Sequence, residues 1–84
     1  MYEILVETHA ERDLRRLEAD VFRRVVDGIR ALAENPRPPG CRKITGSEND
    51  WRIRVGRYRV IYEIDDAARQ VRIMRVRHRR EAYR

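Results

Sequence analysis

The sequence is poor in the residues that build several common kinds of protein. Its 84 residues include one cysteine, Cys41, which excludes an internal disulfide and a metal site made of several cysteines. No apolar run approaches the roughly 18 residues that a membrane-spanning helix needs. The beginning, Met1-Tyr2-Glu3, lacks the basic and then apolar layout of a secretory signal. We therefore expect a cytoplasmic protein with no membrane partner.

Motifs for cofactors and for common catalytic chemistry are also missing. No set of His, Cys, Asp and Glu has metal-ligand spacing, no glycine-rich phosphate loop occurs, and Ser47 alone does not make a serine triad. We expect neither a metal nor a cofactor. A chain this short buries only about 60% of the surface that its unfolded form exposes. Residues 1–84 are therefore predicted to form one domain without a large enclosed active site.

Positive charge is what the sequence has in excess. The net charge is +6, and it divides into −1 for residues 1–50 and +7 for residues 51–84. Nineteen of the twenty basic residues are arginine, with Lys43 as the exception. The guanidinium fork matches the geometry of phosphate groups. A GC-rich genome would produce the same bias, so composition alone does not choose between the two explanations.

The first half of the chain predicts a strand followed by a helix. Residues 2–7 are short and apolar, as in a strand. Thr8 and Glu11 have the spacing of a capping box, so a helix should begin at Thr8. Helical spacing assigns its buried face to Ala10, Leu14 and Leu17, and its solvent face to Arg12, Asp13, Arg15 and Arg16.

A second helix is predicted after residues 19–20, and Asn35-Pro36 ends it. Its apolar stripe consists of Phe22, Val25, Val26, Ile29, Leu32 and Ala33. Gly28 in the middle costs about 1 kcal/mol relative to alanine, which indicates that another backbone packs closely there. The first helix is the expected neighbour, so the two helices should form a hairpin with one shared apolar face.

The second half of the chain changes from helical spacing to alternation. Three strands are predicted at Trp51–Val55, Tyr58–Ile64 and Val71–Val76, with turns at residues 56–57 and 65–67. Short links of this kind favour an antiparallel meander. The expected fold class is α+β: an N-terminal strand, a helical hairpin and a three-stranded antiparallel meander, forming a twisted sheet with the helices on one face.

Alternation also assigns the faces of the sheet. The residues expected to pack against the helices are Trp51, Ile53, Val55, Val60, Tyr62 and Ile64. Arg52, Arg54 and Arg59 then project from the opposite, open face. Like charges side by side on a sheet are destabilising, so a patch of one sign favours a polyanionic ligand. A solvated charged surface is the alternative.

The third predicted strand does not show which of its faces is buried. Val71 and Ile73 share one parity with Arg75 and Arg77, whereas Met74 and Val76 share the other with Arg72. Either assignment adds arginine to the open face. A charged tail extends from the end of this strand and includes His78, Arg79, Arg80 and Tyr83.

The order of the elements and two stretches of sequence resemble a known group of proteins. The stretches are WRIRVGRYRVIYEIDD at residues 51–66 and RVRHRREAYR at residues 75–84. They resemble the RelE/ParE toxin superfamily of bacterial type II toxin–antitoxin modules, over the whole chain. The sequence is more similar to the RelE branch, whose members cleave messenger RNA in the ribosomal A site, than to the ParE branch, which inhibits DNA gyrase.

The resemblance implies a metal-independent endoribonuclease, an mRNA interferase that inhibits translation. Matched by position, its catalytic residues would be Arg52, Arg54, Arg59, Arg79 and Tyr83. Further RNA contacts would come from Arg57, Arg75, Arg77, His78 and Arg80. The best-known pattern has lysines where this chain has Arg52 and Arg54, and a guanidinium does not lose its proton at working pH. The role of general base therefore falls on Tyr83, with His78 in reserve.

The resemblance also implies partners. They are the ribosome with its mRNA, and a RelB-like antitoxin, acidic or partly disordered, that covers the basic face and the nearby sheet edge. Two alternatives stay open. One is a ParE-like inhibitor of DNA gyrase without catalytic activity, and the other is a catalytically inactive relative that acts in antitoxin-bound transcriptional autoregulation. Convergence of Arg59, Arg79 and Tyr83 on one spot would favour the nuclease.

Overall fold

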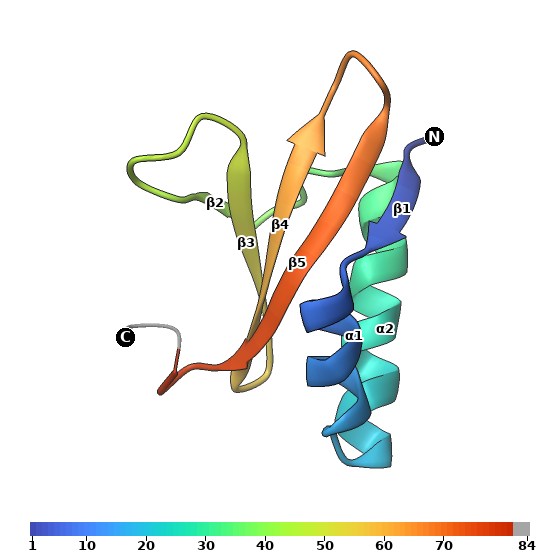
Figure 1. Cartoon of the computed structure of the whole chain (residues 1–84), viewed down its shortest axis with the longest axis vertical. Coiled ribbons are helices and arrows are strands. Elements are labelled where there is room, and N and C mark those ends of the chain that lie inside the picture. The colour runs from blue at the N-terminus through green and yellow to red at the C-terminus, as the bar shows by residue number, and fades with distance from the viewer. Residues whose placement is uncertain (82–84) are drawn as a thin grey trace.

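Residues 1–81 are described in the computed structural model, as a five-stranded sheet with two helices against one of its faces (Figure 1). The elements are β1 (Glu3–Val6), α1 (Thr8–Arg15), α2 (Ala19–Glu34), β2 (Arg42–Lys43), β3 (Asp50–Val55), β4 (Tyr58–Asp65) and β5 (Gln70–His78). The predicted α+β class is confirmed. Within the described range, neither helix is long and apolar enough to cross a membrane.

The sheet has the strand order β1-β5-β4-β3-β2. The predicted meander is confirmed, because β3 pairs antiparallel with β4 and β4 pairs antiparallel with β5. β1 runs parallel to β5, with Ile4 opposite Val71, so the sheet is mixed. β2 is an additional edge strand of two residues, which is too short to show any periodicity in the sequence.

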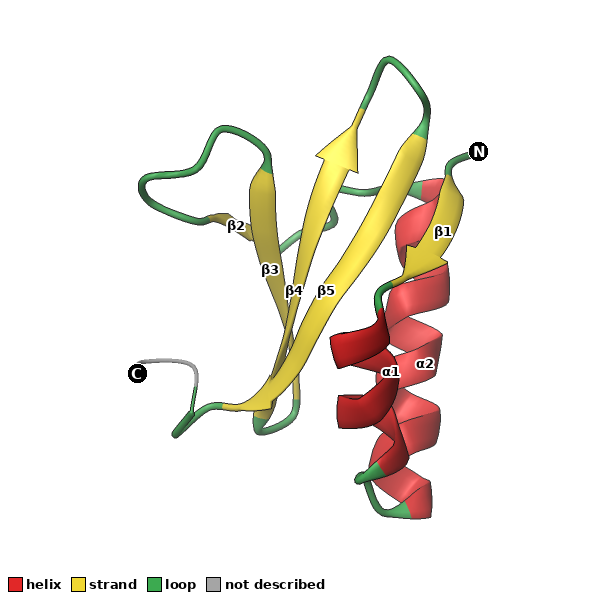
Figure 2. Cartoon of the chain, viewed as in Figure 1, coloured by secondary structure: helices red, strands yellow, loops and turns green. Residues whose placement is uncertain are grey.

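Both helices lie on the same face of the sheet, as Figure 2 shows, and the other face is open. The predicted capping box is wrong, because α1 already includes Thr8 and its N-cap is Glu7, without a side-chain cap hydrogen bond. The Glu7 backbone still follows the sheet, since its N–H donates to the Ile73 carbonyl at 2.9 Å. The Glu7 carboxylate pairs with Arg72 instead, 3.3 Å from its Nε.

The core lies between α2 and the central strands. Val25, Ile29 and Leu32 of α2 are buried there, as the helical stripe predicts. Tyr62 of β4 is fully buried, and its hydroxyl donates to the Pro36 carbonyl at 2.7 Å. Burial also raises the pKa of Tyr62. This hydroxyl therefore fastens the connector after α2 to the middle of the sheet.

Gly28 packs against the sheet and not against the first helix, so the expected neighbour is wrong. A Cβ added at Gly28 would lie 3.1 Å from Val55 Cγ2 and 3.6 Å from Ile53 Cδ1. α2 therefore approaches β3 closely at this point, which a larger side chain would hinder. The position of α2 in turn leaves the opposite face of β3 without a covering helix.

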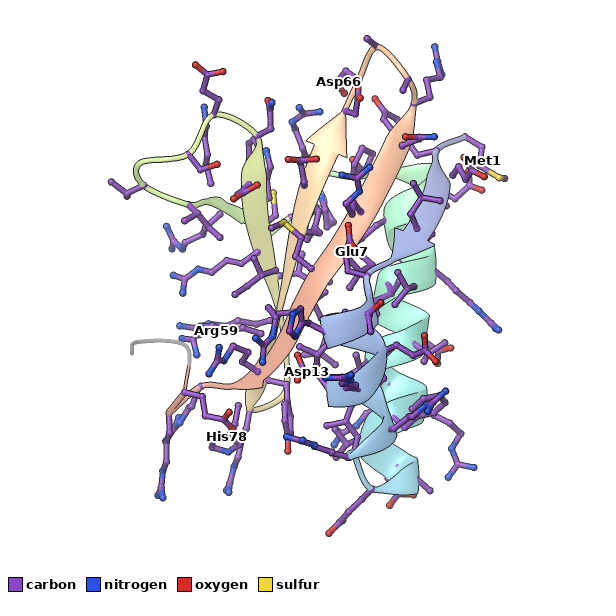
Figure 3. All side chains as sticks on the ribbon, in the orientation of Figure 1. Met1, Glu7, Asp13, Arg59, Asp66 and His78 are labelled. Carbon is purple, nitrogen blue, oxygen red and sulfur yellow. The ribbon has the colours of Figure 1, made fainter. Side chains whose placement is uncertain are left out.

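An ionic cluster joins three distant segments at one end of the sheet. Arg37 Nη2 lies 2.9 Å from Asp66 Oδ2, and the Tyr2 hydroxyl donates to Asp66 Oδ1 at 2.6 Å. These hydrogen bonds, from Arg37 first and then from Tyr2, lower the pKa of Asp66 to about 2. The Arg37 guanidinium also lies over the Trp51 ring, 5.0 Å from its centroid. The cluster holds the connector, the N-terminus and the β4–β5 turn together (Figure 3).

A β-bulge at Met74 settles which face of β5 is buried. Tyr62 pairs with Ile73 while Ile61 pairs with Arg75, so Met74 is the extra residue on β5. The bulge reverses the parity of the strand. Ile73 and Val76 therefore both face the core, with 0% and 3% of their surface exposed, although they lie three positions apart.

Asp13 faces β5, so the prediction that it faces solvent is wrong. β1 ends at Val6, so the second half of β5 pairs with β4 on one edge and has no strand on the other, and α1 lies beside this open edge (Figure 3). Asp13 Oδ2 accepts the Val76 N–H at 2.9 Å and lies 2.9 Å from Arg75 Nε. Only 11% of the Asp13 side chain is exposed. One carboxylate thus takes the place of the missing strand.

Candidate functional site

Three adjacent strands place arginines in one row on the open face. Arg54 of β3 is opposite Arg59 of β4, and Arg59 is opposite Arg77 of β5. Alternation puts all three on the side away from the helices, and Figure 3 shows Arg59 on that side. We call Arg54, Arg59 and Arg77 the arginine row. The structure thus brings together two residues predicted as catalytic and one predicted as an RNA contact.

Arg59 is buried at the centre of this row. The sequence predicted an arginine projecting from the open face, but only 5% of Arg59 is exposed. Arg59 lies in the middle strand of the meander, between Arg54 and Arg77. Burying a guanidinium is costly, and like charges directly opposite on a sheet are destabilising.

Positive charge at the other end of the open face is paired with carboxylates. At the other end of β5, Arg72 is opposite Glu63 and lies 3.7 Å from its carboxylate, and Arg72 also pairs with Glu7 at 3.3 Å. The arginine row is approached by Glu81, whose Oε2 lies 3.8 Å from Arg77 Nη2. The same sheet face thus has an end with paired charges and an end where three guanidinium groups are in register.

Arg52, also predicted as catalytic, lies one row further along β3. It is half-buried and lies between Arg42 of β2 and Ile61 of β4. Its neighbour Arg42 was not predicted as a site residue, because β2 itself was not predicted. The preference for arginine over lysine was the one signal in the sequence that included Arg42.

Two residues predicted as RNA contacts, Arg75 and His78, instead contact other side chains of the protein. Arg75 is held by Asp13 at the edge of β5, with Nε 2.9 Å and Nη2 3.3 Å from the carboxylate. His78 is opposite Tyr58, and the two rings meet edge to face with centroids 5.3 Å apart. Because Tyr58 is opposite Val55, this pair lies on the helix side of the sheet. His78 is therefore on the opposite face from the arginine row.

The remaining predicted residues lie near the β3–β4 turn and in the tail. Arg57 is exposed in the turn, and its carbonyl accepts the Arg79 N–H at 2.8 Å. Arg79 and Arg80 are exposed and lie in the turn that follows β5. Tyr83 lies outside the described residues.

This arrangement can bind and stabilise anions. Guanidinium groups donate several hydrogen bonds and match phosphate geometry, but they do not accept a proton at working pH. No group of three or more His, Cys, Asp or Glu within residues 1–81 is placed to hold a metal ion. The arginine row can thus supply electrostatic stabilisation, whereas a proton transfer would need a residue beyond the row.

The comparisons with known proteins agree with the fold. Residues 4–83 match the family model described as the ParE toxin of the type II toxin–antitoxin system parDE. The toxin–antitoxin complex RelBE2 of Mycobacterium tuberculosis contains a chain that is 30% identical, with a TM-score of 0.81 over 92% of this chain and 96% of that one.

Two further structures are similar at lower identity. A chain of the archaeal RelE–RelB complex of Pyrococcus horikoshii is 24% identical, with a TM-score of 0.83 over 93% of this chain and 94% of that one. The isolated RelE toxin of Escherichia coli is 21% identical, with a TM-score of 0.82 over 99% of this chain and 96% of that one. At these identities the likeness shows the fold alone. No curated protein matches the sequence significantly.

Proposed function

The chain belongs to the ParE toxin family of type II toxin–antitoxin systems, within the RelE/ParE superfamily, and we propose that it is a toxin of the RelE kind. In this proposal it is a ribosome-dependent endoribonuclease that cleaves mRNA and so inhibits translation. The observation that supports the proposal is the arginine row, with Arg59 buried between Arg54 and Arg77. Binding a partner through exposed charge does not require a buried guanidinium at the centre.

The reaction needs no group other than protein side chains. The 2′-hydroxyl of a ribose attacks the adjacent phosphorus, the bond to the 5′-oxygen of the next nucleotide breaks, and the products are a 2′,3′-cyclic phosphate and a free 5′-hydroxyl. The transition state has additional negative charge on the phosphate oxygens. Arg59 would stabilise this charge with Arg54 and Arg77, and its burial strengthens the effect because screening by water is weaker there.

Proton transfer is assigned to residues outside the row. We propose Tyr83 as the general base, because arginine does not serve and neighbouring arginines favour ionisation of a phenol. His78, the reserve candidate, lies on the helix side of the sheet with Tyr58. Tyr83→Phe should therefore abolish most cleavage while binding to ribosomes survives. Full cleavage by this variant on programmed ribosomes would remove the assignment.

The partners follow from the same surface. A small open face binds the RNA backbone and has little area for reading sequence, so the ribosome would present and order the mRNA. The activity would then take place in the cytoplasm, where mRNA is translated. A RelB-type antitoxin is the proposed protein partner, supported by the similar chain in the RelBE2 toxin–antitoxin complex.

The test combines expression in bacteria with a purified system. Induced expression followed by mapping of RNA 5′ ends should show cleavage confined to translated messages. On programmed ribosomes, Arg54→Ala should lower the single-turnover cleavage rate by about 100-fold, as expected when one transition-state donor is removed. Arg30→Ala removes the same charge from the exposed side of α2 and should leave the rate unchanged. Equal losses in the two variants would contradict a specific role for the row.

A second candidate follows from the family model, which is described as a ParE toxin. In that case the chain would inhibit DNA gyrase and catalyse nothing. Intact messages together with DNA damage after induction would favour this candidate over the nuclease. Normal growth with intact messages and DNA would favour a catalytically inactive relative that acts in antitoxin-bound transcriptional autoregulation.

A further inference from the structure

A carboxylate from the turn after β5 lies beside the arginine row. Glu81 Oε2 is 3.8 Å from Arg77 Nη2, which is too far for a hydrogen bond. The Glu81 side chain is 56% exposed and the Arg77 side chain 30%. The Asp13–Arg75 pair, in contrast, is 2.9 Å apart and hydrogen-bonded. Glu81 therefore approaches the row as a loosely held anion.

Arg77 has a donor that Glu81 does not satisfy. Its Nε is buried and has no hydrogen-bond partner among the described residues. A buried donor without a partner is costly, and native structures contain few of them. A guanidinium donates in a planar fork that matches the oxygens of a phosphate. Because Nε is covered in this structure, an anion would reach it only after a neighbouring side chain moves.

The backbone of Glu81 is held in place, whereas its side chain is free to rotate. The Glu81 N–H donates to the His78 carbonyl at 2.8 Å, and the Arg79 N–H donates to the Arg57 carbonyl at 2.8 Å. These hydrogen bonds hold residues 78–81 against the β3–β4 turn. The Glu81 side chain is more than half exposed, so it can turn away from the row without breaking them.

We propose that Glu81 is an internal competitor for the phosphate site at Arg77, an inference that rests on the proposed function. In the free protein the Glu81 carboxylate neutralises part of the positive charge of the arginine row. A phosphate that binds Arg77 displaces this carboxylate, so the ion pair must break first. Glu81 thus lowers the affinity of the row for RNA free in solution. An mRNA held by the ribosome overcomes this loss because its effective concentration at the row is high.

The test measures the Kd of a fluorescent 2′-O-methyl RNA pentamer for the whole purified protein. This RNA lacks the attacking hydroxyl and is not cleaved. Glu81→Gln keeps the shape of the side chain and removes its charge, so the Kd should fall by about three- to fivefold, the upper limit for one exposed ion pair. Glu34→Gln removes the same charge from the exposed last residue of α2 and should lower the Kd by less than about twofold, because salt screens distant charges.

A second comparison tests whether the effect of Glu81 passes through Arg77. In an Arg77→Ala background the ion pair is absent, so Glu81→Gln should change the Kd no more than Glu34→Gln does. The advantage of Glu81→Gln over Glu34→Gln should also shrink as the salt concentration rises from about 50 mM to about 500 mM. Circular dichroism of each variant checks that the fold is intact.

Several outcomes separate this proposal from the nuclease function. Equal gains in affinity in Glu81→Gln and Glu34→Gln, weaker binding in Glu81→Gln, or a full gain in the Arg77→Ala background would overturn the role of Glu81. No binding of the pentamer by Glu81→Gln at low salt would overturn it as well. In each case cleavage on programmed ribosomes would still support the nuclease. A specific gain in Glu81→Gln without ribosome-dependent cleavage would support the competitor and remove the nuclease.

Discussion

Replacing Asp13 by alanine should destabilise the protein by about 2–3 kcal/mol. The Asp13 carboxylate accepts hydrogen bonds from Arg75 Nε and from the Val76 N–H, both at 2.9 Å, and is 11% exposed. A hydrogen bond to a charged group contributes about 1.5–3 kcal/mol, and breaking a fully buried ion pair costs about 3–5 kcal/mol. The Arg75 side chain is 37% exposed and regains water in the variant, so the lower part of this range applies.

Thermal unfolding measures the effect. For a domain of this size each kcal/mol shifts Tm by about 4–8 °C, so Asp13→Ala should lower Tm by about 10–20 °C. Asp13→Asn keeps an oxygen for the Val76 N–H but no charge for Arg75, and should lose about half as much. The control is Asp20→Ala, since the Asp20–Arg23 pair is 3.0 Å apart with side chains 85% and 73% exposed. Such surface pairs contribute under about 1 kcal/mol.

The comparison between the two alanine variants tests whether the Asp13 carboxylate stabilises the edge of β5. Equal losses of Tm in Asp13→Ala and Asp20→Ala would show that the edge of β5 does not depend on the carboxylate. The reasoning would also fail if Asp13→Asn were as unstable as Asp13→Ala, because the backbone hydrogen bond would then contribute nothing.

Three further predictions follow from the structure. Because the pKa of Asp66 is lowered to about 2 from its ordinary value of 3.8, its stabilising effect is complete above the higher value and is lost as the pH falls through the lower one. The difference in urea midpoint between the wild type and Asp66→Asn, with the wild type more stable at neutral pH, should therefore shrink from about pH 4 to about pH 2. Gly28→Ala should raise the free energy of unfolding by about 0.5 kcal/mol, because the gain in helix propensity outweighs the few tenths of an ångström by which the half-buried Val55 side chain must move; a lower urea midpoint would show that Val55 is held in place and that the close approach to β3 decides the outcome. Arg77→Ala should lower the single-turnover cleavage rate on programmed ribosomes by about 10- to 100-fold, whereas Arg75→Ala should lower Tm and leave the rate nearly unchanged; the opposite pattern would contradict the assignment of Arg75 to the fold.

Local patterns in the sequence predicted most of the fold. Val25, Ile29 and Leu32 of the α2 stripe and the alternation of β3 and β4 are confirmed, because one face of each element is buried and the periodicity records it. Phe22, which was also assigned to the stripe, is 41% exposed. The same alternation correctly placed Arg54 and Arg59 together on the open face, although it gave no sign that Arg59 is buried. Burial of a charged residue depends on neighbours from other strands.

The features that the sequence did not predict all depend on contacts between distant segments. Helical spacing places Asp13 on the solvent face of α1. In the structure β1 pairs only with the first half of β5, and Asp13 accepts a hydrogen bond from the Val76 N–H at the edge that remains. The helix begins at Thr8 as predicted, but its N-cap is Glu7, whose N–H is hydrogen-bonded to β5, and not the capping box of Thr8 and Glu11. Arg42 lies opposite Arg52 because β2 pairs with β3, and a strand of two residues leaves no periodic pattern in the sequence.

The bulge at Met74 affects how this chain should be aligned with its relatives. Residues before the bulge follow one alternation and residues after it follow the other, so Arg77 reaches the open face one position later than in a regular strand. A relative whose last strand is regular would have one residue fewer between its buried core position and the arginine equivalent to Arg77. A sequence alignment without a gap at residue 74 would pair Arg77 with a residue on the wrong face. For such a relative, a one-residue gap at residue 74 is needed before the residues of the open face are compared along the chain.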